Sequence, residues 1–414
     1  MTRIFPFRGI LPAPNLTERV ISRPFDKYSK KEVEGIVKEN PDSFLNIIKP
    51  ELANGKSTRP DNPEAQLKSR QKFESFLEKA TLQKSEKELY YIYRQVKPEF
   101  VYTGIIATIS SSDYHSGVIK IHEQTLAPKE EKLKDYLRVV GINAEPVMFT
   151  YPHQTAIDEL VNELTAAQPY ASFHFDSKDH FLWEVSDSKS IARIQEAFEG
   201  VERVYVADGH HRSASSVLLS QELEKESGDT SGQAEWSRFM GIFIPDHNLQ
   251  LFEFNRLIKD LNGLTIFEIL NQLSDDFEVS LIDQPVYKPH SLHEISMYVQ
   301  GKWYSLKLKS DRQNDQLEDK LDANLLSKHI LGPIFGIKDL RNDDRVSFLS
   351  GLLGADELKR LVDKGTYEAA FGLFPVSMEQ FFSFSDRGKM MPPKTTWFEP
   401  KLLNGLVIYD IGHH

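Results

Sequence analysis

The stretch Val204-Tyr205-Val206-Ala207-Asp208-Gly209-His210-His211-Arg212-Ser213-Ala214 decides both the predicted fold class and the position of the candidate site. Residues 202–207 end in an apolar run, which predicts a short buried strand. Gly209 permits a sharp turn there, because glycine adopts positive φ angles at little cost. A helix is predicted to follow at once, over 211–225.

Polar side chains crowd the predicted start of that helix. His210, His211 and Arg212 occupy its first turn, where free backbone N–H groups and the helix dipole favour anions. A guanidinium can grip a phosphate with two parallel hydrogen bonds. Asp208 faces the same turn and could hold a metal or accept a proton. Histidines that only cap the helix or remain solvated are the structural alternative, but this density of polar groups after an apolar strand favours an anion-binding site.

Strand and helix patterns alternate on both sides of this stretch. Strands are predicted at 101–110, 145–151, 238–245 and 302–308, and helices at 127–140, 188–198 and 315–331. Ser29 and Glu32 have the spacing of a capping box, which predicts the start of another helix. Because helices and strands intermingle and several strands are adjacent, we predict an α/β fold with a mixed sheet and α+β character. The predicted domains are a core, 1–260, which carries the Asp-Gly-His-His-Arg site, and a smaller α+β part, 261–414. The end of that second part, 389–401, is expected to fold back and complete the site.

Composition narrows the class of protein. The chain has 414 residues, with 50 Lys and Arg against 61 Asp and Glu, for a net charge of −11. That balance argues against a general nucleic-acid binder, which relies on neutralising phosphates. The absence of cysteine excludes disulfides, thiolate metal sites and cysteine nucleophiles. Because we see neither a signal-peptide pattern nor a run of about 18 apolar residues, we expect a cytoplasmic protein without membrane or nucleic-acid partners. The oligomeric state stays open.

Two further polar clusters lie in the first half of the chain. His122 and Glu123 follow an apparent strand end, and such a pair suits acid–base or metal chemistry. Arg23 and Asp26 flank a turn fixed by Pro24. Each cluster, taken alone, is equally consistent with a loop of structural residues.

A last cluster lies near the C-terminus, from Lys389 to Lys401. Its prolines predict a rigid, extended loop, and it carries Lys394, Thr396 and Lys401 beside an aromatic pair. A phosphate or a nucleotide could lie against such a surface. A purely structural loop is as compatible with this composition.

These clusters, in this order, resemble a bacterial and archaeal domain-of-unknown-function family, number 1015 in that series. The resemblance covers nearly the whole chain and rests on the motifs Arg23-Pro24-Phe25-Asp26, His122-Glu123-Gln124-Thr125, Glu145-Pro146-Val147, Ala207-Asp208-Gly209-His210-His211-Arg212, Met391-Pro392-Pro393-Lys394 and Phe398-Glu399-Pro400-Lys401. Two positions depart from the family pattern: Asn255 stands before Arg256 where the family usually has His, and Phe25 stands where Tyr is usual.

The Asp-Gly-His-His-Arg segment also resembles the phosphate-handling motif of the ParB-like group, which includes nucleotide-dependent free-serine kinases and CTP-binding partition proteins. This second resemblance spans one strand, one turn and one helix. It implies a nucleotide-binding core like that of ParB and serine kinases, with phosphates resting on His210, His211 and Arg212.

From these resemblances and residues we predict a nucleotide-dependent phosphotransferase that acts on a small hydroxylated metabolite, with free serine as the favoured acceptor. The cofactor would be ATP or ADP with Mg²⁺. Asp208 would hold the Mg²⁺ or position the acceptor, and Glu123 or Asp26 would be the general base. His210 completes the catalytic set, and the predicted phosphate and nucleotide ligands are Gly209, His211, Arg212, Arg23, His122, Lys394, Thr396 and Lys401.

Two other functions remain open. A phosphate-ester hydrolase, with a metal held by His122, Asp208, His210 and His211, would be marked by a tightly bound transition metal, which imidazoles favour. The other is a non-catalytic regulator, for which we expect nucleotide binding with no turnover of any metabolite.

Overall fold

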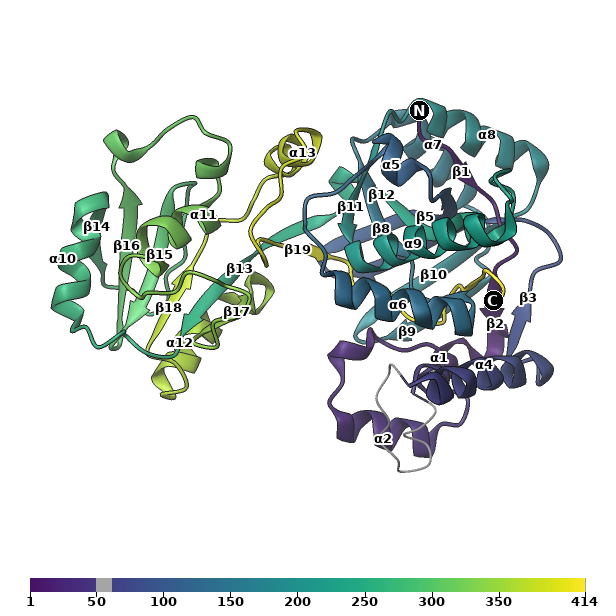
Figure 1. The fold of residues 1–414 in the computed structure, drawn as a ribbon, viewed down its shortest axis with the longest axis horizontal. Helices are drawn as coiled ribbons and strands as arrows, with labels where there is room; N and C mark the ends of the chain where they lie inside the picture. The colour runs from purple at the N-terminus through teal and green to yellow at the C-terminus, as the bar shows by residue number, and fades with distance from the viewer. Residues whose placement is uncertain (50–61, 414) are drawn as a thin grey trace. The chain divides into compact units, whose positions relative to one another are not determined.

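The computed structural model describes residues 1–49 and 62–413 and divides into two compact units. Unit 1 comprises Met1–Leu249 and Pro400–His414, and unit 2 comprises Gln250–Glu399. The chain therefore leaves unit 1 once and returns to it for its last residues. Figure 1 shows the elements of each unit.

Unit 1 is built on a nine-stranded mixed sheet. Its order is β6-β11-β8-β12-β5-β4-β10-β9, with β1 paired to β5. Strands β6 and β11, and strands β8 and β12, are parallel pairs, and the other pairs are antiparallel. The bounds are β1 Ile4–Phe5, β4 Tyr90–Lys97, β5 Phe100–Ser110, β6 Ile119–Lys120, β8 Val147–Tyr151, β9 Ala171–Phe175, β10 Lys178–Val185, β11 Val204–Asp208 and β12 Arg238–Pro245.

Helices cover this sheet in layers. Helix α9 packs on β8 and β12, α6 packs on α9, and α4 packs on α6, while α7 and α8 pack together (Figure 1). Buried aromatic residues fill the space at the sheet, for example Phe149 stacked on Phe243 with 5.0 Å between ring centroids. The helices are α1 Thr17–Val20, α2 Lys30–Glu39, α3 Leu45–Ile48, α4 Pro63–Glu78, α5 Asp113–Ser116, α6 Ala127–Val140, α7 Thr155–Leu164, α8 Ser188–Glu199 and α9 His210–Ser227.

The C-terminal segment is built into unit 1 by backbone pairing. Strand β20 (Tyr409–Asp410) pairs with β7 (Ile142–Asn143), and Ile408 bridges Ile10 in β2 (Ile10–Pro12), which itself pairs with β3 (Leu82–Lys84). Ile10, Ile142 and Ile408 are buried in one apolar cluster with the N-terminal helices. These contacts fix the position of residues 400–413 within unit 1.

Unit 2 is a seven-stranded antiparallel sheet with helices, which is an α+β arrangement. Its order is β14-β16-β15-β18-β13-β17, with β19 also paired to β13. The bounds are β13 Gln250–Ile258, β14 Phe277–Ile282, β15 Glu294–Val299, β16 Lys302–Leu308, β17 Val346–Ser350, β18 Ala369–Gly372, β19 Thr396–Glu399, α10 Ile266–Asp276, α11 Asp322–Leu326, α12 Gly354–Asp363 and α13 Met378–Asp386.

The predicted α/β class with a mixed sheet is confirmed. The boundaries of the two units differ from the predicted division after residue 260 in two places. Strand β13 belongs to unit 2, because it pairs there with β17, β18 and β19. Residues 400–413 belong to unit 1, because their backbone pairs there with Ile10, Ser22 and strand β7. Among the residues described, every helix is too short or too polar to cross a bilayer.

Candidate functional site

The predicted strand, turn and helix are present at the candidate site. Strand β11 ends at Asp208, Gly209 has φ 99°, and α9 begins at His210. A Cβ atom at position 209 would lie 3.1 Å from the guanidinium carbon of Arg212, so a side chain is disfavoured there by space as well as by φ. The pairing of β11 with β8 shifts register between Val206 and Asp208. Such an irregularity at the strand end changes the direction of the side chain that follows.

Asp208 is the centre of a charge cluster. Its Oδ2 accepts a hydrogen bond from Nζ of Lys401 at 2.9 Å, and its Oδ1 lies 4.0 Å from Nη2 of Arg212. Burial alone would raise the pKa of Asp208, but the ammonium of Lys401 and the guanidinium of Arg212 outweigh it and hold the pKa well below its usual range. Asp208 is therefore a carboxylate at every physiological pH.

Arg212 is held by the turn that precedes β8. Its Nη1 donates to the carbonyl oxygens of Glu145 (3.3 Å) and Pro146, and its Nη2 lies 2.9 Å from Oε1 of Glu145. The guanidinium thus joins the start of α9 to the Glu145-Pro146 turn. In this arrangement Arg212 positions both segments and adds positive charge to the site.

Two predicted histidines meet beside Asp208. The rings of His122 and His210 are edge to face, with 4.5 Å between centroids, and both side chains are buried. Burial lowers the pKa of His210 to about 4, although Asp208 opposes the shift, and burial with the neighbouring His210 lowers the pKa of His122. Nδ1 of His210 lies 3.9 Å from Oε2 of Glu123, whose side chain is 46% exposed. Both buried rings are therefore neutral near pH 7.

His211 faces a different set of neighbours on the first turn of α9. Its ring is partly buried, which lowers its pKa, and the ammonium of Lys129 adds to the shift. Lys129 is itself one of the residues that line a cavity next to Arg212. His211 therefore lies close to the cationic side of that cavity.

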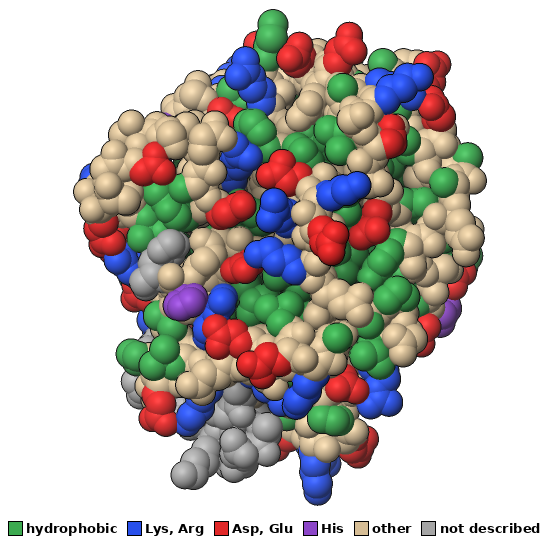
Figure 2. All heavy atoms as spheres, turned by 90° about the vertical axis from the view of Figure 1, so that its right-hand side faces the viewer, with side chains coloured by type: hydrophobic (Ala, Val, Ile, Leu, Met, Phe, Trp, Pro, Cys, Tyr) green, Lys and Arg blue, Asp and Glu red, His purple; other side chains and the backbone are tan. Residues whose placement is uncertain are grey.

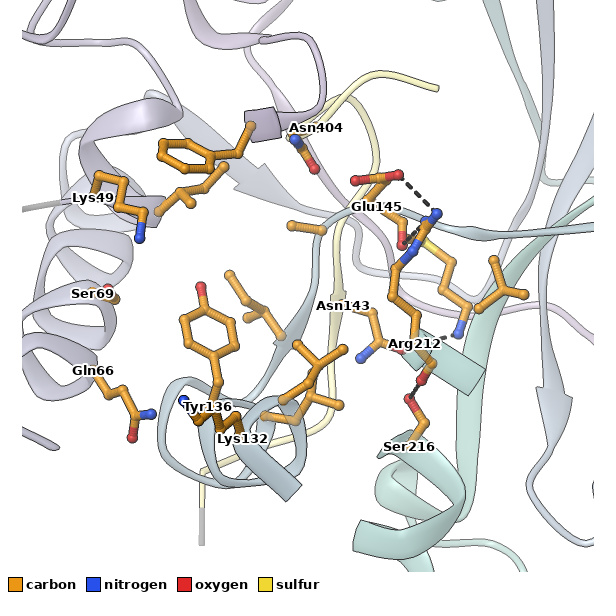
Figure 3. Close-up of a pocket in the computed structure, with 18 of the residues that line it drawn as sticks. Lys49, Gln66, Ser69, Lys132, Tyr136, Asn143, Glu145, Arg212, Ser216 and Asn404 are labelled. Carbon is orange, nitrogen blue, oxygen red and sulfur yellow. Dashed lines mark hydrogen bonds and ion pairs between the residues drawn. The ribbon is translucent and has the colours of Figure 1, made fainter. Parts of the chain in front are cut away.

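The cavity has a volume of about 690 Å³ and lies entirely within unit 1. This volume falls inside the range of roughly 300–1,000 Å³ that small-molecule pockets occupy. Its walls come from α3, α4, α6, α9 and the segment around β7 and β8 (Figure 3). The lining residues are Phe25, Ile48, Lys49, Ala65, Gln66, Ser69, Lys129, Lys132, Leu133, Tyr136, Leu137, Ile142, Asn143, Ala144, Glu145, Val147, Arg212, Ser216, Met240 and Asn404.

The cavity is cationic in a chain that is acidic overall. Among the described lining residues Lys49, Lys129, Lys132 and Arg212 carry positive charge, against one carboxylate, Glu145. Figure 3 shows Arg212 and Glu145 on one wall and Lys49 on the opposite wall. On the face of unit 1 drawn in Figure 2, by contrast, the visible Lys and Arg side chains are interspersed with Asp and Glu. The excess of positive charge in the cavity therefore differs from the mixed charge of that face.

The N-terminal cluster borders the same cavity. Phe25 lines it, and Nζ of Lys49 lies 4.7 Å from the centroid of the Phe25 ring. The carbonyl of Arg23 accepts a hydrogen bond from the amide of Asn404, another lining residue, while the Arg23 guanidinium lies over the Tyr28 ring and 3.7 Å from Asp176. The side chain of Asp26 lies outside the described part of the structure.

Two predicted phosphate ligands, Lys394 and Thr396, belong to unit 2. Lys394 has φ 54° and its Nζ lies 5.1 Å from the centroid of Phe254, and Thr396 opens β19 opposite Glu253. Their predicted role in phosphate binding stays a prediction.

Asn255, which replaces the usual family histidine, is a buried structural residue of unit 2. Its Oδ1 accepts the backbone N–H of Leu373 at 3.0 Å, and its amide donates to Glu253. This position therefore joins β13 to the end of β18.

The metal ligands predicted for a hydrolase do not gather closely. In the described ranges, 1–49 and 62–413, the one set of three potential ligand atoms within 4.8 Å of one another comes from His153, Asp246 and His247, and not from the histidines around Asp208. Proteins commonly hold Mg²⁺ with one or two carboxylates together with the substrate's phosphates. The candidate carboxylates here are Asp208 and Glu145, which flank Arg212. Both fit that ligand chemistry, although Lys401 already engages one oxygen of Asp208.

Several cavity residues escape the sequence analysis. Lys129, Lys132 and Tyr136 all lie on α6, at spacings of three and four residues, and so share one face of the helix. That spacing could have indicated a shared functional face. A charged helix face is, however, usually just exposed to solvent, so the spacing alone does not predict a cavity wall. The N-terminal helices supply Gln66 and Ser69, which no local motif marks.

Solved structures similar to this chain share little of its sequence and superpose weakly. Free serine kinase in complex with AMP is 14% identical, with 71% of this chain and 87% of that chain covered and a TM-score of 0.34. A conserved hypothetical protein from Pyrococcus furiosus is 13% identical (72% and 94% covered, TM-score 0.34), and SbnI with a C-terminal truncation from Staphylococcus aureus is 11% identical (71% and 82% covered, TM-score 0.37). No curated protein matches the sequence.

The family comparison covers most of the chain. It includes the site residues from Arg23 to Arg212, and Lys401 and Asn404 lie beyond it. A model described as "Protein of unknown function (DUF1015)" matches residues 4–324. The predicted resemblance is confirmed, and the chain belongs to the DUF1015 family.

Proposed function

We propose that unit 1 binds a nucleotide in the cationic cavity and transfers a phosphoryl group between it and a small hydroxylated metabolite. The observation that carries this proposal is the cavity itself: among the described residues, four cationic side chains and one carboxylate line a volume of about 690 Å³, in a chain of net charge −11. A local excess of positive charge in an acidic protein favours a small polyanion.

The cavity also offers apolar and aromatic surface for a base. Phe25 and Tyr136 line it together with aliphatic residues, and aromatic rings can stack on a nucleobase. The cationic residues Lys129, Lys132 and Arg212 would then neutralise the phosphates. Arg212 lies in the first turn of α9, where backbone N–H groups lack acceptors within the helix. The cavity thus offers both cationic groups and apolar surface, the two kinds of partner that a nucleotide requires.

The charge cluster next to the cavity supports group transfer. Asp208 stays ionised beside Lys401 and Arg212, so it suits holding Mg²⁺ or orienting the acceptor and is too weak a base to take a proton. The side chain of Glu123 is 46% exposed, so a substrate can reach it, and its Oε2 lies 3.9 Å from Nδ1 of the buried His210. We assign Glu123 as the general base and His210 as the residue that positions it.

In the proposed reaction the acceptor hydroxyl oxygen attacks the terminal phosphorus of the nucleotide. The bond to the bridging oxygen breaks, the nucleotide leaves with one phosphate fewer, and Glu123 receives the hydroxyl proton. Lys401 and Arg212 would stabilise the charge on the transferring group, since phosphoryl transfer depends chiefly on positioning and electrostatics. Mg²⁺ bound with the nucleotide would supply further neutralisation of the phosphates. Free serine is the first acceptor to test.

The test is a screen of ATP, ADP and CTP against small hydroxylated acceptors, with phosphorylated acceptor and spent nucleotide both quantified. We expect acceptor-dependent formation of ADP or AMP. The Glu123→Gln variant should lose at least 100-fold in kcat, the lower end of the usual contribution of a general base, and keep the nucleotide affinity.

Glu196→Gln, a change on the exposed surface of α8, is the matched control and should turn over normally. Phosphate release without any acceptor product would indicate the hydrolase instead. Nucleotide binding without turnover would indicate the regulator, and no binding at all would contradict the proposal.

A further inference from the structure

A second group of ligand-type side chains lies in unit 1 at the ends of two parallel strands. Strands β8 and β12 pair in parallel, with Tyr151 opposite Pro245, so that the residues after them emerge at the same edge of the sheet. His153 follows β8, and Asp246 and His247 follow β12. One ligand atom from each of these three residues lies within 4.8 Å of the others.

The carboxylate of Asp246 is fixed in position by the backbone. Its Oδ1 accepts the N–H groups of His153 at 3.2 Å and of His247 at 2.9 Å. These bonds occupy one oxygen and orient the other, Oδ2, without using it. Asp246 is therefore a held carboxylate that lies beside both imidazoles, with its Oδ1 3.9 Å from Nδ1 of His247.

The two imidazoles are arranged around that carboxylate. The rings of His153 and His247 are nearly perpendicular, with 5.3 Å between their centroids. Nδ1 of His247 lies 3.9 Å from Oδ1 of Asp246, and Nε2 on the other side of the ring lies 3.7 Å from Oδ2 of Asp158, in the first turn of α7. A carboxylate on the second nitrogen is the usual partner of a metal-bound histidine, because it fixes the ring and its tautomer.

We propose that His153, Asp246 and His247 bind one first-row divalent transition-metal ion, such as Zn²⁺, with Asp158 orienting His247. Two imidazoles and a carboxylate favour such an ion over Mg²⁺ or Ca²⁺, which prefer all-oxygen sites. Bonds of about 2.1 Å to Zn²⁺ require the ligand atoms to approach one another to about 3.4 Å in tetrahedral geometry. The two histidine side chains are partly or largely exposed, so they can rotate this far without disturbing the core. Water would complete the coordination.

The proposed metal would join the loop after β8 to the loop after β12. The metal site would be separate from the cationic cavity, because none of His153, Asp246 and His247 lines that cavity. The proposal is thus independent of the nucleotide proposal, and either can fail without the other.

The test is calorimetric titration of the untagged full chain with Zn²⁺, together with the visible absorption of the Co²⁺-substituted protein. We expect one Zn²⁺ per chain and the d–d bands of a low-coordinate Co²⁺ site. His153→Ala, His247→Ala and Asp246→Asn should each weaken Zn²⁺ binding at least tenfold and remove those bands. Asp158→Asn should weaken binding by roughly tenfold, the lower end for a residue that orients a metal ligand.

His174→Ala is the matched control, because His174 is also exposed in unit 1 and lies 2.7 Å from a carboxylate, that of Asp179, without a second histidine in its group. Its Zn²⁺ affinity should equal that of the wild type. Equal Zn²⁺ binding by the wild type and the His153→Ala and His247→Ala variants would overturn the proposal, as would the absence of stoichiometric binding by the wild type. Circular dichroism on each variant checks that the fold is intact.

Discussion

The surroundings of each side chain at the candidate site set its protonation state. Lys401 and Arg212 keep Asp208 ionised, whereas burial keeps His210 neutral, so that acidic and neutral groups sit side by side at one pH. Such separation of neighbouring pKa values is common at functional sites. Arg212 both adds charge to the cavity and holds the Glu145-Pro146 turn, which is why its replacement would alter two properties at once.

The lowered pKa of His210 predicts a pH-dependent stability. In the unfolded chain a histidine titrates near 6.5, and in the folded protein His210 titrates near 4. Between these values the unfolded chain binds the extra proton, so the free energy of unfolding falls as pH drops from about 6.5 to about 4. The full effect of this residue is about 3 kcal/mol. Urea unfolding at pH 7 and pH 5 should show a smaller pH dependence for His210→Gln than for the wild type.

Ser220→Ala, at a buried residue of the same helix without a titratable group, should retain the pH dependence of the wild type. An unchanged pH dependence in His210→Gln would mean that His210 is accessible to protons in the folded protein.

Much of the site could be predicted at the level of single residues, because it is concentrated in one short motif. Asp208, Gly209 and the histidines are contiguous in the sequence, and local patterns show such groups directly. Lys401 was found through a proline-rich cluster, but its bond to Asp208 arises only when the C-terminal segment pairs with the N-terminal strands. Contacts of that range leave no local signal.

At the scale of elements, the turn at Gly209 connects strand β11 to the N-terminal end of α9. Replacing it with Ala should destabilise the protein by about 1–3 kcal/mol, since Ala must adopt φ near 99° and its Cβ would press on the guanidinium of Arg212. Gly228→Ala is the matched control, because Gly228 ends the same helix with φ 71° and open space around its Cβ position.

Both variants should lose stability through strain, and only Gly209→Ala should also weaken nucleotide binding through the displaced Arg212. Urea unfolding and calorimetry on both variants check this. Equal nucleotide affinity in the two would show that the turn geometry does not matter for the ligand.

Elements with strong local patterns were predicted well. The helix 127–140 and the strands 238–245 and 302–308 match their predicted bounds, and the capping box of Ser29 and Glu32 opens α2. The predicted continuous helix over 315–331 is wrong: short helical turns precede α11, which begins only at Asp322. Strand β15 was missed because Glu294 and Ser296 break its apolar pattern. Both side chains are nevertheless buried in unit 2, where Glu294 accepts a hydrogen bond from the hydroxyl of Ser305.

The whole molecule consists of one unit inserted into another. Gln250 and Glu399, the first and last residues of unit 2, are paired across β13 and β19, so the insertion begins and ends at adjacent points. Each unit has its own apolar core. Domains joined in this way commonly fold independently.

We therefore predict that unit 1 folds without unit 2. A chain in which residues 250–399 are replaced by a short Gly-Ser linker should unfold cooperatively and bind a nucleotide within about threefold of the full chain, because every lining residue of the cavity is in unit 1. The same chain lacks Lys394 and Thr396, so its turnover tests their predicted role. Loss of nucleotide binding in a folded unit 1 would contradict the assignment of the cavity.

The cavity of unit 1, with its excess of positive charge, should bind a nucleotide through its phosphates. The most direct measurement is calorimetric titration of the full chain with ATP, ADP, CTP and adenosine. We predict one nucleotide per chain, adenosine binding at least tenfold weaker, and at least a tenfold loss of nucleotide affinity, about 1.4 kcal/mol, in the double variant Lys129→Ala/Lys132→Ala. The double variant Lys225→Ala/Lys302→Ala removes the same charge away from the lining and should bind like the wild type. Equal affinity in both double variants, or adenosine binding as tightly as ATP, would contradict the account.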